Sequence, residues 1–282
     1  MLQHVTPSVA IDLLRRHRLR AGRRHGQHFL VDPNTVRRIV RLAGISPNET
    51  ILEIGPGLGS LTVALAEAAS RVVAVEIDAA VAEALTEVVG DAPNVELVVG
   101  DAMKTDLAVV VGGAARLVAN LPYNVATPLL LHVLDDVPDV AGGLVMVQRE
   151  VGERWTASPG SRAYGAVSVH VAFHAEARIA GEVPPTVFLP PPEVASVLVE
   201  FRRRDVPPVD VDDAGALFRF VRSAFGHRRK TLRNSLEAAG LGRAVVEAAL
   251  ADAGLEGRVR PEQLTLAEFA RLYSALGAGK TA

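Results

Sequence analysis

The alternation of strand-like and helix-like segments from residue 50 onward most constrains the fold of this chain. Short runs rich in β-branched residues predict buried strands, and the runs between them carry apolar side chains at helical spacing. The expected strands are 50–54, 71–77, 95–99, 116–119 and 144–147, and the expected helices are 61–69, 79–89 and 128–134. Strands that alternate with helices form parallel βαβ units, so the pattern predicts an α/β fold with a mostly parallel sheet covered on both faces.

The pattern changes after residue 150. Apolar residues alternate with polar ones over 167–174, which predicts a strand, and 194–201 predicts another. Joined by a proline-rich loop, the two are expected to add antiparallel strands at one edge of the sheet. Residues 202–213 are interpreted as a linker, and the chain beyond them is predicted to be helical. The expected organisation is a basic N-terminal extension (1–24), an α/β domain (25–203) and a small C-terminal helical domain (204–282).

Composition excludes several classes of protein. Apolar residues make up 49% of the chain and charged residues 22%, which is typical of a globular protein. The chain has no cysteine, which excludes disulfides, thiolate metal sites and a cysteine nucleophile. No apolar run reaches the length of a membrane span, and the N-terminus lacks the apolar core of a signal peptide. We therefore expect a cytoplasmic protein.

The net charge of −2 hides two basic clusters. Six of the ten residues from Arg15 to Arg24 are arginine, and a second cluster runs from His227 to Arg233. Local clusters of this kind attract phosphate groups even when the total charge is balanced. They favour a nucleic-acid partner, and we expect the first cluster to be mobile in the free protein and to contact RNA.

A histidine pair in the first late strand does not predict a metal site. On a strand, His170 and His174 would share a face but lie about 13 Å apart. That separation is too long for two ligands of one ion, so we expect no metal.

A glycine loop follows the first strand. It reads Glu53-Ile-Gly-Pro-Gly-Leu-Gly59 and precedes a predicted helix, so its backbone can approach a ligand closely. Glu76 ends the second strand, 19 residues after Gly57, where a carboxylate can accept hydrogen bonds from ribose hydroxyls. Asp101 ends the third strand at the same edge of the sheet. The G-x-G-x-x-G/A fingerprint of dinucleotide binding fails at Ser60, which disfavours a nicotinamide oxidoreductase. The pattern resembles instead the S-adenosylmethionine site of class I methyltransferases.

The fourth strand ends in Asn120-Leu-Pro-Tyr-Asn124, which resembles the motif of methyltransferases that act on exocyclic amines of bases. An adenine N6 amine is weakly nucleophilic because its lone pair is delocalised into the ring. The oxygen of Asn120 and a nearby backbone carbonyl can accept its two N–H groups, which favours rehybridisation of the nitrogen. Tyr123 can stack on the base, which is worth about 1–3 kcal/mol. Phe188, in a stiff loop with five prolines, could clamp the other face of a flipped-out base.

Four segments together resemble one family. They are 26–30, the glycine loop, the Asn120 motif and 225–236, and the resemblance spans residues 12 to about 275. The chain resembles the rRNA adenine N6,N6-dimethyltransferases, and within them the small-subunit (KsgA/RsmA) branch. The chain departs from the family at His28, where the family usually has Asn, and at Gly226-His227, where it has Asn-Gln.

The resemblance implies a class I methyltransferase with a seven-stranded Rossmann-like sheet. It implies transfer of four methyl groups from S-adenosylmethionine to N6 of two adjacent adenosines in the 3′-terminal hairpin of 16S rRNA, within a 30S subunit or late precursor. The enzyme is expected to be a monomer.

The same resemblance implies a role for each matching residue. The expected cofactor contacts are His28, Leu30, Gly55, Glu76, Asp101 and Asn120. The expected catalytic contacts with the base are Asn120, Leu121, Pro122, Tyr123 and Phe188. The expected RNA contacts are Arg228, Arg229, Lys230 and Arg233 in the C-terminal domain.

Two alternatives remain at this point. The macrolide-resistance branch dimethylates one adenosine of large-subunit rRNA with a similar loop and motif. A non-catalytic nucleic-acid-binding factor could use the same fold. The basic segment after Ala224 and the triple proline at 190–192 favour the small-subunit branch, and the intact acidic and Asn120 positions favour an enzyme.

Overall fold

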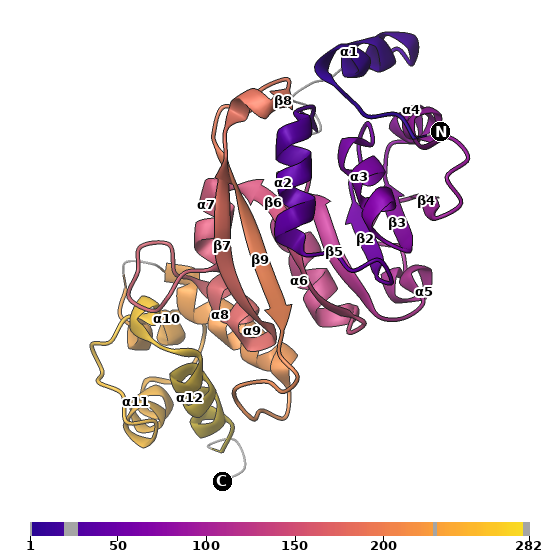
Figure 1. Cartoon of the computed structure of the whole chain (residues 1–282). Coiled ribbons are helices and arrows are strands. Elements are labelled where there is room, and N and C mark those ends of the chain that lie inside the picture. Colours follow the sequence, from indigo (N-terminus) through magenta and orange to yellow (C-terminus); the bar gives the residue numbers. More distant parts are fainter. Residues whose placement is uncertain (1, 20–27, 228–229, 279–282) are drawn as a thin grey trace. The chain divides into compact units, whose positions relative to one another are not determined.

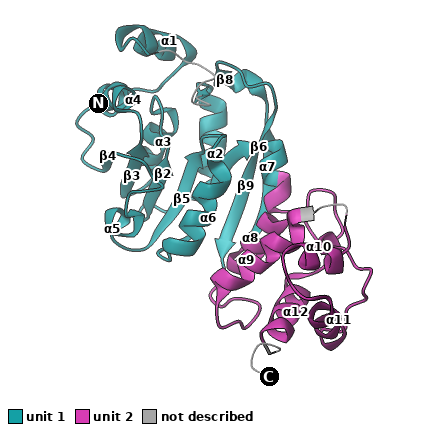
Figure 2. Cartoon of the chain, turned by 180° about the vertical axis from the view of Figure 1, so that it is seen from behind, with its two compact units in different colours: residues 1–152, 177–203 teal, residues 153–176, 204–282 magenta. Residues whose placement is uncertain are grey.

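The computed structural model describes residues 2–19, 28–227 and 230–278 (Figure 1). The chain forms two compact units, which are coloured separately in Figure 2. Unit 1 comprises residues 1–152 and 177–203, and unit 2 comprises 153–176 and 204–282. The predicted boundary at 203 is therefore incomplete, because residues 153–176 group with the C-terminal helices.

Unit 1 is built on a seven-stranded sheet with the order β4-β3-β2-β5-β6-β9-β7. Its strands are β2 (Thr50–Ile54), β3 (Arg71–Glu76), β4 (Val95–Val99), β5 (Ala115–Asn120), β6 (Val140–Gln148), β7 (Ala175–Val183) and β9 (Ser196–Arg203). Strands β2 to β6 pair in parallel, and β9 pairs antiparallel with β6. The predicted α/β class, the mostly parallel sheet and the late antiparallel strand are confirmed.

The helices of unit 1 are α1 (Pro7–Arg16), α2 (Pro33–Ala43), α3 (Ser60–Ala68), α4 (Ala79–Val89), α5 (Leu107–Val111), α6 (Ala126–Asp136) and the first part of α7 (Arg149–Trp155). Several of them begin at a side chain that caps their N-terminus, among them α2 and α4. The Asp32 carboxylate accepts from the Thr35 N–H at 2.7 Å, and Asp78 accepts from the Ala80 N–H at 3.0 Å. Such caps satisfy N–H groups that have no partner within the helix.

Helices α2 and α3 share a core with the middle of the sheet. Ile39 and Leu65 are buried beside Ile51, Val118 and Leu144, all at most 1% exposed. A separate short pairing joins β1 (Phe29–Leu30) to β8 (Phe188–Leu189), with Phe29 opposite Leu189 and Leu30 opposite Phe188. This pairing brings the start of the α/β region next to the proline-rich loop.

Helix α1 joins the N-terminal segment to unit 1. Leu13 is fully buried in a cluster with Phe29 and Leu58. Arg16 forms ion pairs with Asp12 and Glu87, and His17 Nε2 lies 2.9 Å from Glu87 Oε2. The expectation that the whole of Arg15–Arg24 is mobile is therefore wrong for its first residues, which belong to this packed segment; residues 20–24 lie outside the described ranges.

Unit 2 is helical. It contains α8 (Ala166–His174), α9 (Ala214–Ala224), α10 (Leu232–Ala238), α11 (Arg243–Asp252) and α12 (Leu266–Ala278). Its core includes Val169 and Phe173 of α8, Leu217 of α9, Val246 of α11 and Phe269 of α12. The predicted linker precedes α9, whose N-terminus is capped by Asp213.

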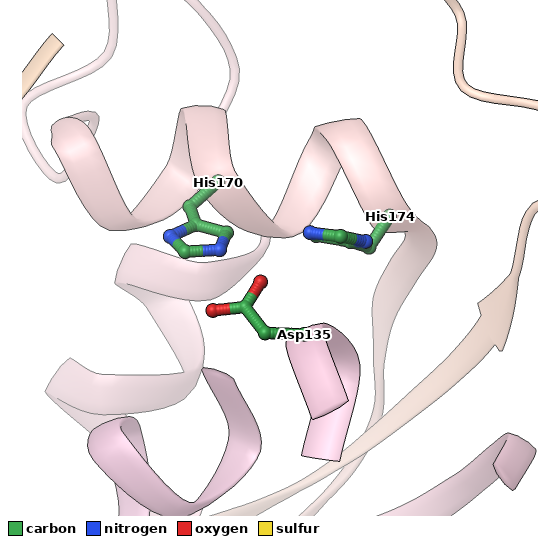
Figure 3. A group of neighbouring side chains, drawn as sticks. All are labelled: Asp135, His170 and His174. Carbon is green, nitrogen blue, oxygen red and sulfur yellow. The ribbon is translucent and has the colours of Figure 1, made fainter. Parts of the chain in front are cut away.

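The strand predicted over 167–174 is wrong, because these residues form α8. Five of its nine residues are buried, including Ser168 and His170, so the apolar alternation does not mark one buried face. The two histidines lie on one side of the helix with ring centroids 5.4 Å apart, not about 13 Å (Figure 3). His170 also stacks on Phe218 at 3.6 Å. The geometric reason given against a metal is thus removed, and the absence of a metal stays a prediction.

Across the described ranges, none of the helices combines the length and apolar character that crossing a bilayer requires.

Candidate active site

A cavity of about 610 Å³ lies in unit 1 at the carboxyl ends of the parallel strands. This is the edge at which open α/β sheets bind ligands, and the volume suits a small-molecule cofactor. The following residues predicted for the cofactor or the base line it: His28, Leu30, Gly55, Glu76, Asp101, Asn120, Leu121, Pro122 and Tyr123. The structure therefore brings together segments that are up to 95 residues apart in the sequence.

The glycine loop forms one wall. Gly55 and Gly57 have φ angles of 72° and 57°, a region that favours glycine. A Cβ on Gly57 would lie 3.0 Å from Phe29 Cδ1, and one on Gly55 would lie 3.1 Å from Pro122 Cγ. The loop thus needs glycine both for its backbone angles and for its close approach to the two neighbouring segments.

Glu76 fastens this loop to the end of β3. Its Oε2 accepts from the Gly57 N–H at 3.2 Å, and its Oε1 accepts from the Asp78 N–H at 3.0 Å. The residue is 5% exposed, and burial raises its pKa while these backbone hydrogen bonds oppose the shift. Each carboxylate oxygen keeps lone pairs that can accept from two vicinal hydroxyls.

Asp101 lies at the next strand end. Its Oδ1 accepts from the Met103 N–H at 3.0 Å, and Lys104 Nζ lies 3.7 Å from Oδ2. The side chain is about one-third exposed and lines the cavity beside Met103. It can accept a hydrogen bond from an exocyclic amine.

Glu53 is a cavity residue for which the sequence suggested no role. It is 1% exposed at the end of β2, and its Oε2 has no hydrogen-bond partner among the described residues. Burial raises the pKa of its carboxyl to about 8, and the nearby charge of Glu76 adds to the shift. The signal was present as the first letter of the glycine motif, but a strand residue before a turn is ordinarily structural.

The Asn120 amide has a fixed orientation. Its Nδ2 donates to the His28 carbonyl at 3.2 Å, and a carbonyl cannot donate in return. Its Oδ1 is buried and has no partner among the described residues. An unpaired buried acceptor costs about 1–3 kcal/mol, so a donor from a ligand would satisfy it.

Tyr123 is held at both ends. Its hydroxyl lies 2.6 Å from Ser196 Oγ, and its ring stacks on His28 with centroids 5.4 Å apart and planes at 29°. Burial raises the pKa of its phenol, so the hydroxyl stays protonated at neutral pH. Sequence reasoning missed Ser196, because a serine at the start of a strand carries no signal of its own.

Phe188 differs from the expectation. It is 2% exposed in the core of unit 1 and is not among the described residues that line the cavity. Its ring meets Tyr123 edge-on at a centroid distance of 6.5 Å. In this structure Phe188 therefore packs against the Tyr123 ring from within the core. A contact between Phe188 and a base stays a prediction.

The four predicted RNA contacts have different surroundings. Arg228 and Arg229 lie outside the described residues. Lys230 is exposed, whereas Arg233 of α10 lies 3.3 Å from Glu247 and 3.8 Å from Glu237. Arg233 thus has acidic partners within unit 2, with which an RNA phosphate would compete.

These features fit S-adenosylmethionine. The cavity offers a glycine cradle, a buried acid for ribose hydroxyls, a second acid for an adenine amine, and the unpaired Glu53 oxygen in the same cavity. The acidic side chains of Glu76 and Asp101 suit a cofactor that carries a sulfonium and an ammonium group.

Comparisons with known proteins agree with this geometry. A family model described as ribosomal RNA adenine dimethylase matches residues 18–277. The "Ribosomal RNA small subunit methyltransferase A" of Leifsonia xyli subsp. xyli is 47% identical over 277 residues, which cover 96% of this chain and 98% of the relative. The protein of the same name from Moorella thermoacetica is 43% identical over 281 residues, covering 96% and 98%.

Two solved structures resemble the whole fold. The 23S rRNA methyltransferase ErmE is 27% identical with a TM-score of 0.67, covering 88% of this chain and 99% of that one. A dimethyladenosine transferase from Plasmodium falciparum is 23% identical with a TM-score of 0.73, covering 89% and 98%, and supports the fold alone. The expected class I methyltransferase fold is confirmed. This chain, an S-adenosylmethionine-dependent methyltransferase, belongs to the ribosomal RNA adenine dimethylase family.

Proposed function

We propose that this enzyme dimethylates N6 of two adjacent adenosines in the 3′-terminal hairpin loop of 16S rRNA, within a 30S subunit or late precursor in the cytoplasm. The names of relatives that are 43–48% identical to this chain support the small-subunit substrate. The monomeric state stays a prediction.

The pairing of Asn120 carries the proposal. Its Nδ2 is occupied by the His28 carbonyl, so Oδ1 is the end of the amide that remains to accept an N6–H. In the proposed site the Leu121 carbonyl accepts the other N6–H, and Pro122 shapes the turn that presents Tyr123. A hydrogen bond to each N–H draws the lone pair out of conjugation with the ring, so that it can attack the methyl carbon.

The remaining residues position the reactants. Tyr123 stacks on the base, and its attachment to Ser196 and His28 holds the ring ready before RNA arrives. Glu76 and Asp101 bind the ribose and adenine of the cofactor, and His28, Leu30 and Gly55 complete its wall. When bound, the cofactor supplies an electrophilic methyl group on a sulfonium, which is a good leaving group. The nitrogen loses its proton to water after methylation, so no strong base is needed.

Basic residues of unit 2 extend the RNA contact in this proposal. Arg228, Arg229, Lys230 and Arg233 would meet phosphates of the rRNA. Lys230 is exposed, which supports its availability. Contacts of this kind are weakened by salt, so the affinity for subunits should fall as ionic strength rises.

A large-subunit adenosine is the second candidate, because ErmE shares most of the fold. The test is to incubate the protein with labelled S-adenosylmethionine and undermethylated 30S or 50S subunits, and to map modified adenosines by mass spectrometry. Two adjacent dimethyladenosines in the 16S 3′ hairpin are the expected result. Label confined to 23S rRNA would replace the proposal with the second candidate, and no label in either would overturn both.

A further inference from the structure

His28 contacts both residues that hold the base in the proposed site. Its backbone carbonyl accepts from Asn120 Nδ2 at 3.2 Å. Its imidazole lies against the Tyr123 ring, with centroids 5.4 Å apart and planes at 29°. One residue therefore touches the hydrogen-bonding group and the stacking group from the side of the N-terminal segment.

His28 is itself held from a second direction. Its Nδ1 lies 2.8 Å from the Pro190 carbonyl oxygen. A carbonyl only accepts, so Nδ1 carries a proton and donates, and it does so whether or not Nε2 is protonated. The next residue continues this attachment, because Phe29 pairs with Leu189 in the β1–β8 ladder. The position of the imidazole is thus set by the proline-rich loop.

We propose that His28 is a positioning residue for the target adenine, acting through Asn120 by its carbonyl and through Tyr123 by its ring. This goes beyond a contact with the cofactor, and it rests on the proposed function because it assumes an adenine beside Tyr123. The carbonyl orients the Asn120 amide so that Oδ1 is the acceptor that remains. The ring restricts Tyr123, whose hydroxyl is already held by Ser196. Restraints that exist before binding lower the entropic cost of ordering the site around the base.

Two substitutions at His28 separate the ring from the donor. H28N keeps a side-chain N–H that can donate to the Pro190 carbonyl but removes the ring that stacks on Tyr123. H28F keeps a ring against Tyr123 but removes the N–H. Neither changes the backbone carbonyl, so Asn120 keeps its partner in both. The matched control is H4N, at a histidine that is 64% exposed and paired with Glu67.

A double-mutant cycle with Y123L tests whether His28 acts through Tyr123. An aromatic pair is worth about 0.5–1.5 kcal/mol, so H28N should lower the methylation rate at saturating cofactor about 2- to 10-fold. In the Y123L background the same substitution should have almost no effect, because its target is gone. H28F should keep more of the wild-type rate than H28N, and H4N should match the wild type.

The measurements are single-turnover methylation of the subunit that the wild type modifies, and cofactor affinity by calorimetry. H28N is expected to change the cofactor dissociation constant by less than about threefold, which corresponds to less than 1 kcal/mol of binding free energy. Equal effects of H28N in the wild-type and Y123L backgrounds would overturn the proposal while leaving the proposed function intact. So would a loss of cofactor affinity that accounts for the whole loss of rate. A wild type that labels neither subunit would overturn the proposed function, and the inference with it.

Discussion

Two residues of the cavity carry buried oxygens that have no hydrogen-bond partner among the described residues. They are Glu53, at the end of β2, and Asn120, at the end of β5. Folding gains nothing from such atoms, because each gives up its hydrogen bonds to water. Their presence at two adjacent strand ends indicates that the fold tolerates a local cost to keep acceptors available for ligands.

Replacing Asn120 with Ala is expected to separate catalysis from cofactor binding. A hydrogen bond to a reacting group is worth about 1.5–3 kcal/mol, so turnover should fall by about 10- to 100-fold. The cofactor dissociation constant should stay within several-fold, because Glu76 and Asp101 remain. Single-turnover methylation and calorimetry measure the two quantities. Loss of cofactor binding with no further loss of rate would show that Asn120 is mainly a cofactor ligand.

Glu53 predicts a pH dependence of stability. Its pKa in the folded protein is about 8, above the 4.5 that is ordinary for a glutamate in an unfolded chain. Between these two values the unfolded chain releases the proton while the folded protein keeps it. The free energy of unfolding should therefore fall as pH rises through this window, by up to about 1.4 kcal/mol per pH unit. In E53Q this contribution is absent.

The measurement is urea unfolding of the cofactor-free protein at pH 5, 6, 7 and 8. The stability of E53Q relative to the wild type should increase steadily with pH, since all other titrating groups are common to both proteins. If the free energy of unfolding depended on pH in the same way in E53Q and in the wild type, a raised pKa at Glu53 would be contradicted.

Single residues of the site were partly predictable from the sequence. The acidic strand ends and Asn120 could be found because strand position and residue type together limit their chemistry. Phe188 could not, since an aromatic residue in a loop can face a ligand or the core, and here it is 2% exposed. Ser196 and the Pro190 carbonyl act through tertiary contacts that leave no local pattern.

At the level of elements, prediction succeeded where the hydrophobic period was decisive. The expected 50–54, 79–89 and 95–99 coincide with β2, α4 and β4. It failed at α8, whose valines alternate with small and polar residues as in a strand. Because α8 is buried on most sides within unit 2, its sequence shows no apolar stripe at helical spacing.

Helix α1 offers a test of how the N-terminal segment is held. Leu13 is fully buried, whereas Ile11 on the same helix is 48% exposed. L13A should cost about 2–5 kcal/mol of local stability and speed hydrogen exchange of the α1 amides. I11A should leave their exchange almost unchanged. If hydrogen exchange measured by mass spectrometry showed the same protection of the α1 amides in L13A and I11A, Leu13 would not be the residue that anchors the helix.

For the whole molecule, the division into two units predicts two levels of stability. Phe269 is fully buried in unit 2, and the only tryptophan, Trp155, is 2% exposed in the same unit. F269A should lower the stability reported by tryptophan fluorescence by about 3–5 kcal/mol. The urea concentration at which cofactor binding is lost should stay near the wild-type value, because the cavity belongs to unit 1. An equal shift of the fluorescence and binding transitions would show that the units unfold together.

The domain boundaries were the least predictable feature at this scale. The sequence was read as one α/β region up to residue 203, yet unit 2 takes 153–176 from the middle of that region. Only the packing of Val169 and Phe173 with later helices reveals this, and no local pattern encodes a partner more than 40 residues away.

The contact between His28 and Pro190 also determines the order in which parts of the site can form while the chain is being synthesised. The two residues are 162 positions apart, so at about 5–20 residues per second roughly 8 to 30 s separate their synthesis. When Tyr123 is added, Glu53, Glu76 and Asp101 are already present, whereas Pro190, which binds the His28 imidazole, and Ser196, which binds the Tyr123 hydroxyl, are not. During synthesis, the residues that bind the methyl donor are therefore complete well before those that bind the RNA base. RNA methylation becomes possible only after the last two strands of the sheet, β7 and β9, have been made and have paired.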